Sequence, residues 1–111
     1  QESFDNIVKK IDRIAEKNKR PLLLTEIGFR NISHPWVLPH AHDDKGIVNP
    51  AHQERAYQIV FEGLKKSKTV AGLFWWKYPT FLTYSAHNPT GFTPLGNPAE
   101  ATVKEYFGAR K

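Results

Sequence analysis

The stretch Leu22-Leu23-Leu24-Thr25-Glu26-Ile27-Gly28-Phe29 decides the fold, because an apolar run ends there in a single carboxylate. Residues 21–24 predict a buried strand, and Glu26 comes where that strand ends. An unpaired buried charge is costly, so a glutamate beside a core is usually either paired or used. Ligands bind at the carboxyl ends of parallel strands, which makes Glu26 a candidate catalytic group. The alternative is a glutamate that reaches solvent or pairs with a nearby arginine.

Hydrophobic periodicity predicts three helices and two strands in alternation. Apolar residues recur at helical spacing from Ser3 to Lys17, and again after Asn49-Pro50 and after Asn97-Pro98. Asn followed by Pro is a helix start signal, since Asn caps the first turn and Pro fits the first helical position. Strands are expected at Leu22–Glu26 and at Val70–Trp76. This order is typical of an α/β protein with parallel strands.

Each expected helix carries apolar residues that should face the core. In the first helix these are Phe4, Ile7, Val8, Ile11, Ile14 and Ala15. In the second helix they are Ala56, Tyr57, Val60, Phe61 and Leu64. In the third helix Val103 and Phe107 should face inward, and Glu100 stands at the third helical position, where it should complete a capping box.

The connectors differ in length in a way that indicates a barrel. Each helix-to-strand link has only a few residues, whereas the strand-to-helix links extend over about residues 30–48 and 79–96. Long loops after the strands are typical of a (β/α)8 barrel, although a doubly wound open sheet would also place functional loops there. A barrel needs eight strands and typically ~250 residues, so two strands predict a portion of one. Such a portion should expose apolar strand faces and an unpaired edge.

Composition narrows the function classes. The chain has 111 residues, which allows one small domain, and no Cys, which removes disulfides and thiolate chemistry. The formal net charge is +5, but the basic residues line helix faces and helix ends, so no nucleic-acid partner is expected. No apolar run in the sequence is long enough to span a membrane. The sequence has no phosphate-binding or dinucleotide-binding motif, so no cofactor is expected. The absence of Met and the opening Gln1 suggest an excised or processed piece.

Three motifs resemble one group of enzymes. Residues 25–29 (TEIGF) and 72–78 (GLFWWKY) resemble the last two strands of clan A glycoside hydrolases. Residues 91–100 (GFTPLGNPAE) are similar to the pattern Gly-Phe-Ser-Pro-x-Gly-Lys-Pro-Ala-Glu that leads into the final helix of such enzymes. Within the clan the chain resembles glycoside hydrolase family 113, the endo-β-1,4-mannanase-like (β/α)8 barrels. The resemblance implies that residues 1–111 are the C-terminal portion of a single TIM-barrel domain, from helix six to helix eight with two parallel strands. The rest of that barrel is then the expected partner of this portion.

The resemblance further implies retaining hydrolysis of a β-linked polysaccharide such as β-1,4-mannan. By position, Glu26 matches the strand-seven nucleophile. The acid/base glutamate of the clan lies on strand four, to which nothing in this chain corresponds, and retaining chemistry needs both carboxyl groups about 5–5.5 Å apart. The chain alone is therefore expected to be inactive. Two alternatives remain open: a non-catalytic carbohydrate-binding or structural barrel relative, and an autonomous module that binds a partner.

The second strand ends in residues that should meet the sugar. Trp76 corresponds to the strand-eight aromatic platform beneath the sugar at the cleavage point, and an indole ring suits the C–H face of a pyranose. Strand alternation puts Gly72 and Trp76 on one face, so Trp75 should pack outward against helices. The alternative for Trp76 is core packing. Lys77 and Tyr78 could hydrogen-bond sugar hydroxyls, and Tyr78 could also orient Glu26.

The first long loop offers further candidates. Arg30 lies close enough along the chain to pair with Glu26 and stabilise its charge, or it is a surface residue of the loop. Trp36 stands between two prolines and is either the wall of a neighbouring sugar subsite or a loop anchor. The run His40-Ala41-His42-Asp43-Asp44 has donor atoms suited to Zn or Ca. Since no further spaced ligands accompany it, no metal is expected, and solvated or sugar-bonding side chains are the preferred interpretation.

Overall fold

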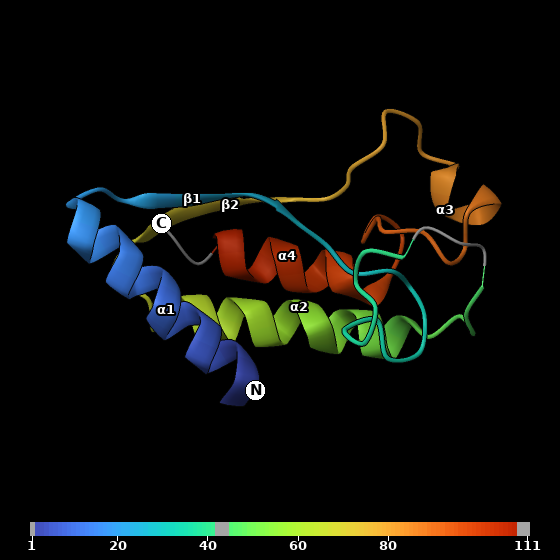
Figure 1. Ribbon diagram of the computed structural model, residues 1–111. Coiled ribbons are helices and arrows are strands. Elements are labelled where there is room, and N and C mark those ends of the chain that lie inside the picture. The colour runs from blue at the N-terminus through green and yellow to red at the C-terminus, as the bar shows by residue number, and fades with distance from the viewer. Residues whose placement is uncertain (1, 42–44, 109–111) are drawn as a thin grey trace. The chain divides into compact units, whose positions relative to one another are not determined.

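The computed structural model describes residues 2–41 and 45–108, and it confirms the alternation of helices and strands (Figure 1). The elements are α1 (Glu2–Asn18), β1 (Leu22–Ile27), α2 (Pro50–Leu64), β2 (Val70–Trp75), α3 (Tyr84–His87) and α4 (Pro98–Gly108). The sequence pattern does not predict α3, a single turn inside the second long loop. The chain forms two compact units, one of residues 1–27 with 59–75 and one of residues 28–58 with 76–111.

In the first unit β1 and β2 lie side by side and run in the same direction (Figure 1). The paired residues are Leu22 with Val70, Leu23 with Gly72, Leu24 with Leu73, and Ile27 with Trp75. The predicted parallel pairing is therefore confirmed. Because the strands are parallel, both end at the same edge of the sheet, and the chain leaves this edge into each of the two long loops.

The two faces of this strand pair have different surroundings. Trp75 packs edge-on against Phe61 of α2, with ring centroids 5.3 Å apart. The opposite face carries Leu23 and Phe74, whose side chains are 56% and 63% exposed. The predicted outward packing of Trp75 against a helix and the predicted apolar strand face are both confirmed. Large apolar side chains that remain exposed on a sheet face are typical of a surface that another part of a protein covers.

The apolar stripe of α1 is only partly covered within the first unit. Val8 and Ala15 are buried, as expected. Ile7 and Ile14 are 47% and 58% exposed, so the prediction that they face the core is wrong for the described unit. Phe4, which belongs to the same stripe, packs closely against α2 at Gly63, where a Cβ would lie 2.5 Å from the Phe4 ring.

Asp12 on α1 holds the connector between α2 and β2. Its carboxylate accepts hydrogen bonds from the hydroxyls of Ser67 and Thr69 and from the backbone N–H of Lys68. The Ser67 hydroxyl, followed by that of Thr69, lowers the pKa of Asp12 below its usual value of 3.8.

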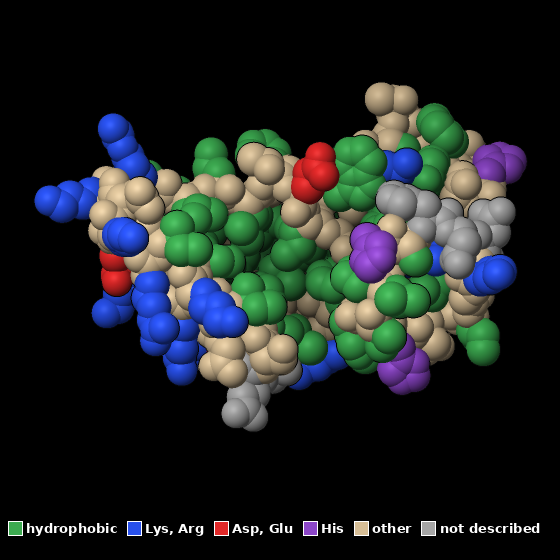
Figure 2. Space-filling model, in the orientation of Figure 1, with side chains coloured by type: hydrophobic (Ala, Val, Ile, Leu, Met, Phe, Trp, Pro, Cys, Tyr) green, Lys and Arg blue, Asp and Glu red, His purple; other side chains and the backbone are tan. Residues whose placement is uncertain are grey.

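Figure 2 shows Lys and Arg side chains gathered over α1, where the exposed residues are Lys9, Lys10, Arg13 and Lys17. These charges lie on the solvated face of an amphipathic helix.

The predicted start and stripe of α2 are confirmed. The Asn49 side-chain oxygen accepts the His52 backbone N–H at 3.0 Å, which is the N-cap bond expected from Asn-Pro. The buried stripe residues are Ala56, Tyr57, Val60 and Phe61, and Leu64 is partly buried. Tyr57 has no exposed surface, and its ring packs edge-on against Phe29 with centroids 6.4 Å apart. Burial raises the pKa of Tyr57 far above its usual value.

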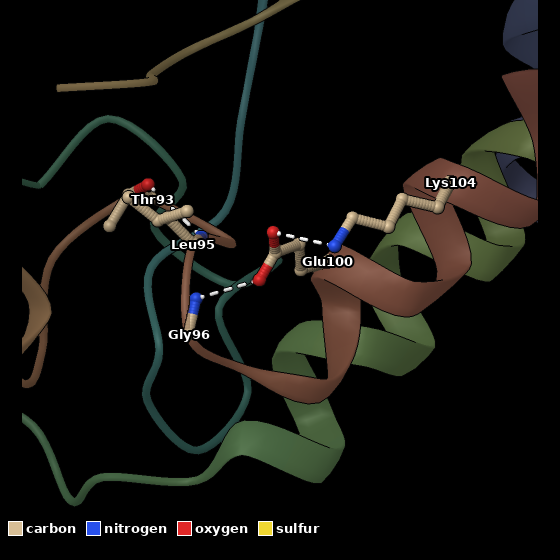
Figure 3. A network of polar contacts seen from close by, with 5 residues as sticks. All are labelled: Thr93, Leu95, Gly96, Glu100 and Lys104. Carbon is tan, nitrogen blue, oxygen red and sulfur yellow. Dashed lines mark hydrogen bonds and ion pairs between the residues drawn. The ribbon is translucent and has the colours of Figure 1, made fainter. Parts of the chain in front are cut away.

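The start of α4 differs from a standard capping box. Glu100 accepts the backbone N–H of Gly96 at 3.0 Å and pairs with Lys104 at 3.0 Å (Figure 3). The predicted acceptance from Asn97 is wrong, because the Asn97 N–H already donates to the Pro94 carbonyl at 2.9 Å. The Gly96 N–H, followed by Lys104, lowers the pKa of Glu100. The acidic start of α4 is therefore anchored one residue earlier than the sequence predicts.

The inward face of α4 is also narrower than expected. Val103 is buried, whereas Phe107 is 50% exposed, so the prediction for Phe107 is wrong. Phe107 lies in the last turn, beyond the part of the helix that the buried residues Ala99, Thr102 and Val103 occupy.

Among the described helices, none is both long enough and apolar enough to cross a membrane.

Candidate functional site

Glu26 lies in a bulge at the carboxyl end of β1. Between the pairs Leu24–Leu73 and Ile27–Trp75, β1 advances by three residues while β2 advances by two, so β1 holds one extra residue there. A bulge of this kind interrupts the strict alternation of faces and can redirect a side chain. Both Thr25 and Glu26 are exposed as a result.

The Glu26 side chain is exposed. Within the described residues of its own unit, no hydrogen bond or ion pair holds it. Glu26 is the penultimate residue of β1, whose Leu22 and Leu24 are partly buried and hold the strand in place. An exposed carboxylate on a fixed strand end can act as a nucleophile, as a base or as an acceptor of ligand hydrogen bonds.

Trp76 directly follows β2, and its backbone lies against Gly28. A Cβ built on Gly28 would lie 2.0 Å from the Trp76 carbonyl oxygen and 3.0 Å from its carbonyl carbon. Only glycine allows this approach, because the obstacle is backbone. The Trp76 side chain is 43% exposed, and the peptide bond to Lys77 is cis. Since β2 ends at Trp75, alternation along the strand does not itself fix the direction of Trp76. Within the described residues much of Trp76 stays exposed, and the choice between a sugar platform and core packing stays a prediction.

Lys77 lies beside aromatic rings. Its ammonium group is 5.7 Å from the centroid of the Trp76 ring and 5.1 Å from that of Tyr84. Both distances are within the range of cation–π attraction. The sequence singles out Lys77 as a sugar ligand but gives no sign of Tyr84, which reaches it from α3.

Tyr78 is about half exposed and lies in the electrostatic field of Glu100. Partial burial, followed by the negative charge of Glu100, raises the pKa of Tyr78 above its usual value. The phenol is therefore protonated at neutral pH and can donate a hydrogen bond to a ligand oxygen. A conjectured partnership between Tyr78 and Glu26 stays a prediction.

Arg30 and Asn31 tie the first long loop to the second. The Arg30 side chain is buried, and its Nε donates to the Thr90 carbonyl at 3.0 Å. Asn31 donates through its side chain to the Pro89 carbonyl at 2.8 Å and through its backbone to the Gly91 carbonyl at 2.9 Å. The interpretation of Arg30 as a surface residue is wrong, because its side chain is buried and its guanidinium donates a hydrogen bond to the protein backbone.

Gln53 of α2 is a further link between the loops that sequence reasoning misses. Its side-chain amide has no exposed surface and donates to the carbonyls of Phe29 and Thr93, both at 3.1 Å. One buried side chain thus fixes the segment that follows β1 and the segment that precedes α4. A fully polar residue inside the apolar stripe of α2 is the one sequence signal that could have identified it.

Trp36 belongs to a cluster of three rings, of which two are on the first loop and one is on α2. Its ring lies 5.6 Å from that of His34 and 5.3 Å from that of His52. The His52 Nδ1 accepts the backbone N–H of His34 at 3.0 Å, which joins the cluster to α2. Trp36 remains 43% exposed, so it is anchored on one side and open on the other. Both predicted roles, subsite wall and loop anchor, are compatible with this geometry.

The predicted donor run at residues 40–44 lies partly outside the described residues. His42, Asp43 and Asp44 are not described, so their arrangement is not assigned. Within residues 2–41 and 45–108, no group of three or more His, Asp or Glu side chains is placed to hold a metal ion.

The sequence model of Glycoside Hydrolase Family 113 matches residues 1–97. No curated protein matches the chain. The chain is similar to a solved complex of a family 113 β-1,4-mannanase, with 24% identity, a TM-score of 0.84, and coverage of 96% of this chain and 35% of that one. A second structure of such an enzyme gives 25% identity, a TM-score of 0.83 and the same coverage.

A third similar structure is the family 113 β-mannanase from Alicyclobacillus acidocaldarius in complex with ManMIm. It gives 24% identity, a TM-score of 0.85, and coverage of 97% of this chain and 35% of that chain. The chain therefore spans about a third of the length of each of these enzymes. These matches confirm the expected family resemblance and the α/β class, with a fold that corresponds to part of a TIM barrel.

Proposed function

The chain belongs to glycoside hydrolase family 113, and we propose that it is part of a retaining enzyme that cleaves a β-linked polysaccharide such as β-1,4-mannan. The similar structures are described as mannanases, and the similarity extends over nearly the whole chain. Residues 1–111 are proposed to form the C-terminal portion of a single barrel domain. The exposed Leu23 and Phe74 support this proposal, because the interior of a barrel would cover that face.

Glu26 is the proposed nucleophile. The observation that carries this assignment is an exposed carboxylate, in a bulge, at the carboxyl end of a parallel strand. In the first step a Glu26 oxygen attacks the anomeric carbon, and the bond to the leaving oxygen breaks as a second carboxylic acid protonates it. In the second step that group takes a proton from water, and the water oxygen replaces Glu26 on the sugar. The second carboxyl group is proposed to come from the remaining barrel, so this chain alone is inactive.

The other candidate residues have supporting roles in this proposal. Trp76 presents its exposed indole face to the C–H face of the sugar at the cleavage point. Tyr78 donates its phenol proton to a sugar hydroxyl, and Trp36 contributes apolar surface to a neighbouring subsite. Lys77 lies beside the platform, and Arg30 holds the loop that follows Glu26 through its bond to the Thr90 carbonyl.

The test uses the full-length protein that carries this chain. Glu26→Gln keeps the size of the side chain but removes the nucleophilic charge, so we expect mannan hydrolysis to fall by at least about four orders of magnitude while sugar binding is retained. Glu16→Gln, at an exposed position of α1, is the matched control and should behave as the wild type. Near-parental activity in Glu26→Gln would contradict the assignment. Mannan binding without hydrolysis by the wild type would favour a non-catalytic relative.

The oligomeric behaviour of the 111-residue chain separates the proposal from an autonomous binding module. With an exposed apolar strand face, the isolated chain should aggregate or co-purify with a second polypeptide in size-exclusion chromatography with intact mass detection. A well-folded monomer of 12.7 kDa would favour the module instead.

A further inference from the structure

The ammonium group of Lys77 lies over two aromatic rings, Trp76 beside it in the chain and Tyr84 in α3. The two centroid distances, 5.7 Å and 5.1 Å, are short enough for both rings to attract the charge. Lys77 is only partly exposed, which limits the screening of this attraction by water. One cation thus connects an exposed indole to a ring from a different segment.

The Tyr84 ring is itself held in place. A Cβ built on Gly91 would lie 3.1 Å from a ring carbon of Tyr84, so the backbone at Gly91 packs closely against this ring. The Phe81 ring also packs against the Tyr84 ring, with a centroid distance of 5.4 Å. The turn of α3 is fixed as well, because the Ser85 hydroxyl donates to the Leu95 carbonyl and the Asn88 N–H donates to the Tyr84 carbonyl.

We propose that Lys77 is a positioning residue, which holds the Trp76 platform in orientation by binding its charge between the Trp76 ring and the anchored Tyr84 ring. The inference rests on the proposed role of Trp76 as the sugar platform. An indole that is 43% exposed is only partly enclosed by protein atoms, and a cation shared with a second, packed ring adds a restraint on its rotamer. Lys77 therefore acts on the sugar through Trp76, and Tyr84 is the part of this device that sequence motifs do not reveal.

Matched variants separate the charge from the shape. Lys77→Met removes the charge at similar length, and Lys77→Arg keeps a cation that stacks on aromatic rings. Tyr84→Leu removes the ring, and Tyr84→Phe keeps it. In the full-length enzyme we expect Lys77→Met and Tyr84→Leu each to lower kcat/KM for β-mannan about tenfold, and the double variant to be no worse than either, since the residues act as a unit. Lys77→Arg and Tyr84→Phe should remain near the wild type.

A readout that does not depend on catalysis completes the test. In protein labelled with fluorotryptophan, the fluorine resonance of Trp76 is assigned by its loss in Trp76→Phe. We expect the Trp76 resonance to shift or broaden in Lys77→Met and Tyr84→Leu and to be unchanged in Lys77→Arg. The Trp36 resonance should stay constant in all three variants. An unchanged Trp76 resonance in Lys77→Met, or a Tyr84→Leu enzyme with wild-type kcat/KM, would overturn the inference. A shifted resonance in a protein without hydrolase activity would uphold it and reject the proposed function instead.

Discussion

Gly28→Ala should damage stability and activity together. The new Cβ would meet the Trp76 carbonyl oxygen at 2.0 Å, and atoms at such positions are essentially never closer than 3.0 Å, so the backbone must separate by about 1 Å. Overpacking costs about 1–3 kcal/mol, and the upper end applies here because backbone cannot rotate away as a side chain can. A displacement of about 1 Å at a substrate-positioning residue costs about a hundredfold in rate.

The assay compares thermal unfolding and mannan hydrolysis of the full-length protein. A loss of about 3 kcal/mol in the free energy of unfolding corresponds to a fall in Tm of about 6–12 °C for a domain of about 150–250 residues. Gly108→Ala is the matched control, because a Cβ there meets no atom within 4 Å. We expect this control to be neutral. A Gly28→Ala enzyme with the wild-type Tm and wild-type kcat would show that the close approach of Gly28 and Trp76 is not a constraint.

Two further substitutions test how the elements are held. Asp12→Asn should lower the free energy of unfolding by about 1 kcal/mol at neutral pH. Because folding lowers the pKa of Asp12, this difference between the variant and the wild type should persist above about pH 4 and vanish as the pH falls through the folded-state pKa. Denaturant titration at several pH values measures it. A difference that does not change with pH would contradict the charge-based explanation. Gln53→Leu should cost about 1–3 kcal/mol, since it removes the donor that the Phe29 carbonyl has in Gln53 and one of the two side-chain donors, Gln53 and Asn97, that the buried Thr93 carbonyl has. Gln58→Leu on the same helix is the control, and equal melting temperatures for the two variants would refute the role of Gln53.

Local chemistry made most of the fold predictable. The Asn49-Pro50 signal fixed the start of α2, because a side-chain cap needs only residues that are neighbours in sequence. The apolar runs predicted both strands to within two residues, and their parallel pairing followed from the helix between them. Phe107 and Ile7 were misassigned because periodicity reports which face is apolar, and not whether a described neighbour covers it.

The site was less predictable because its details depend on tertiary contacts. The bulge at Glu26 is a property of the register between two strands, which the sequence of one strand does not specify. The approach of Gly28 to Trp76 joins residues far apart along the chain, and the contact of Lys77 with Tyr84 depends on how the loop between them folds back. Gln53 was missed since a single polar residue in an apolar stripe does not show which carbonyls it serves.

A covalent label on Glu26 is the most direct measurement. The full-length enzyme is incubated with a fluorinated mannosyl fluoride, which slows breakdown of the glycosyl-enzyme, and the labelled protein is digested and sequenced by mass spectrometry. We expect one sugar per protein, attached to the peptide that contains Glu26, and no label in Glu26→Gln. Attachment to a different carboxylate, or turnover with inversion at the anomeric carbon and no covalent species, would contradict the assignment of Glu26 as nucleophile.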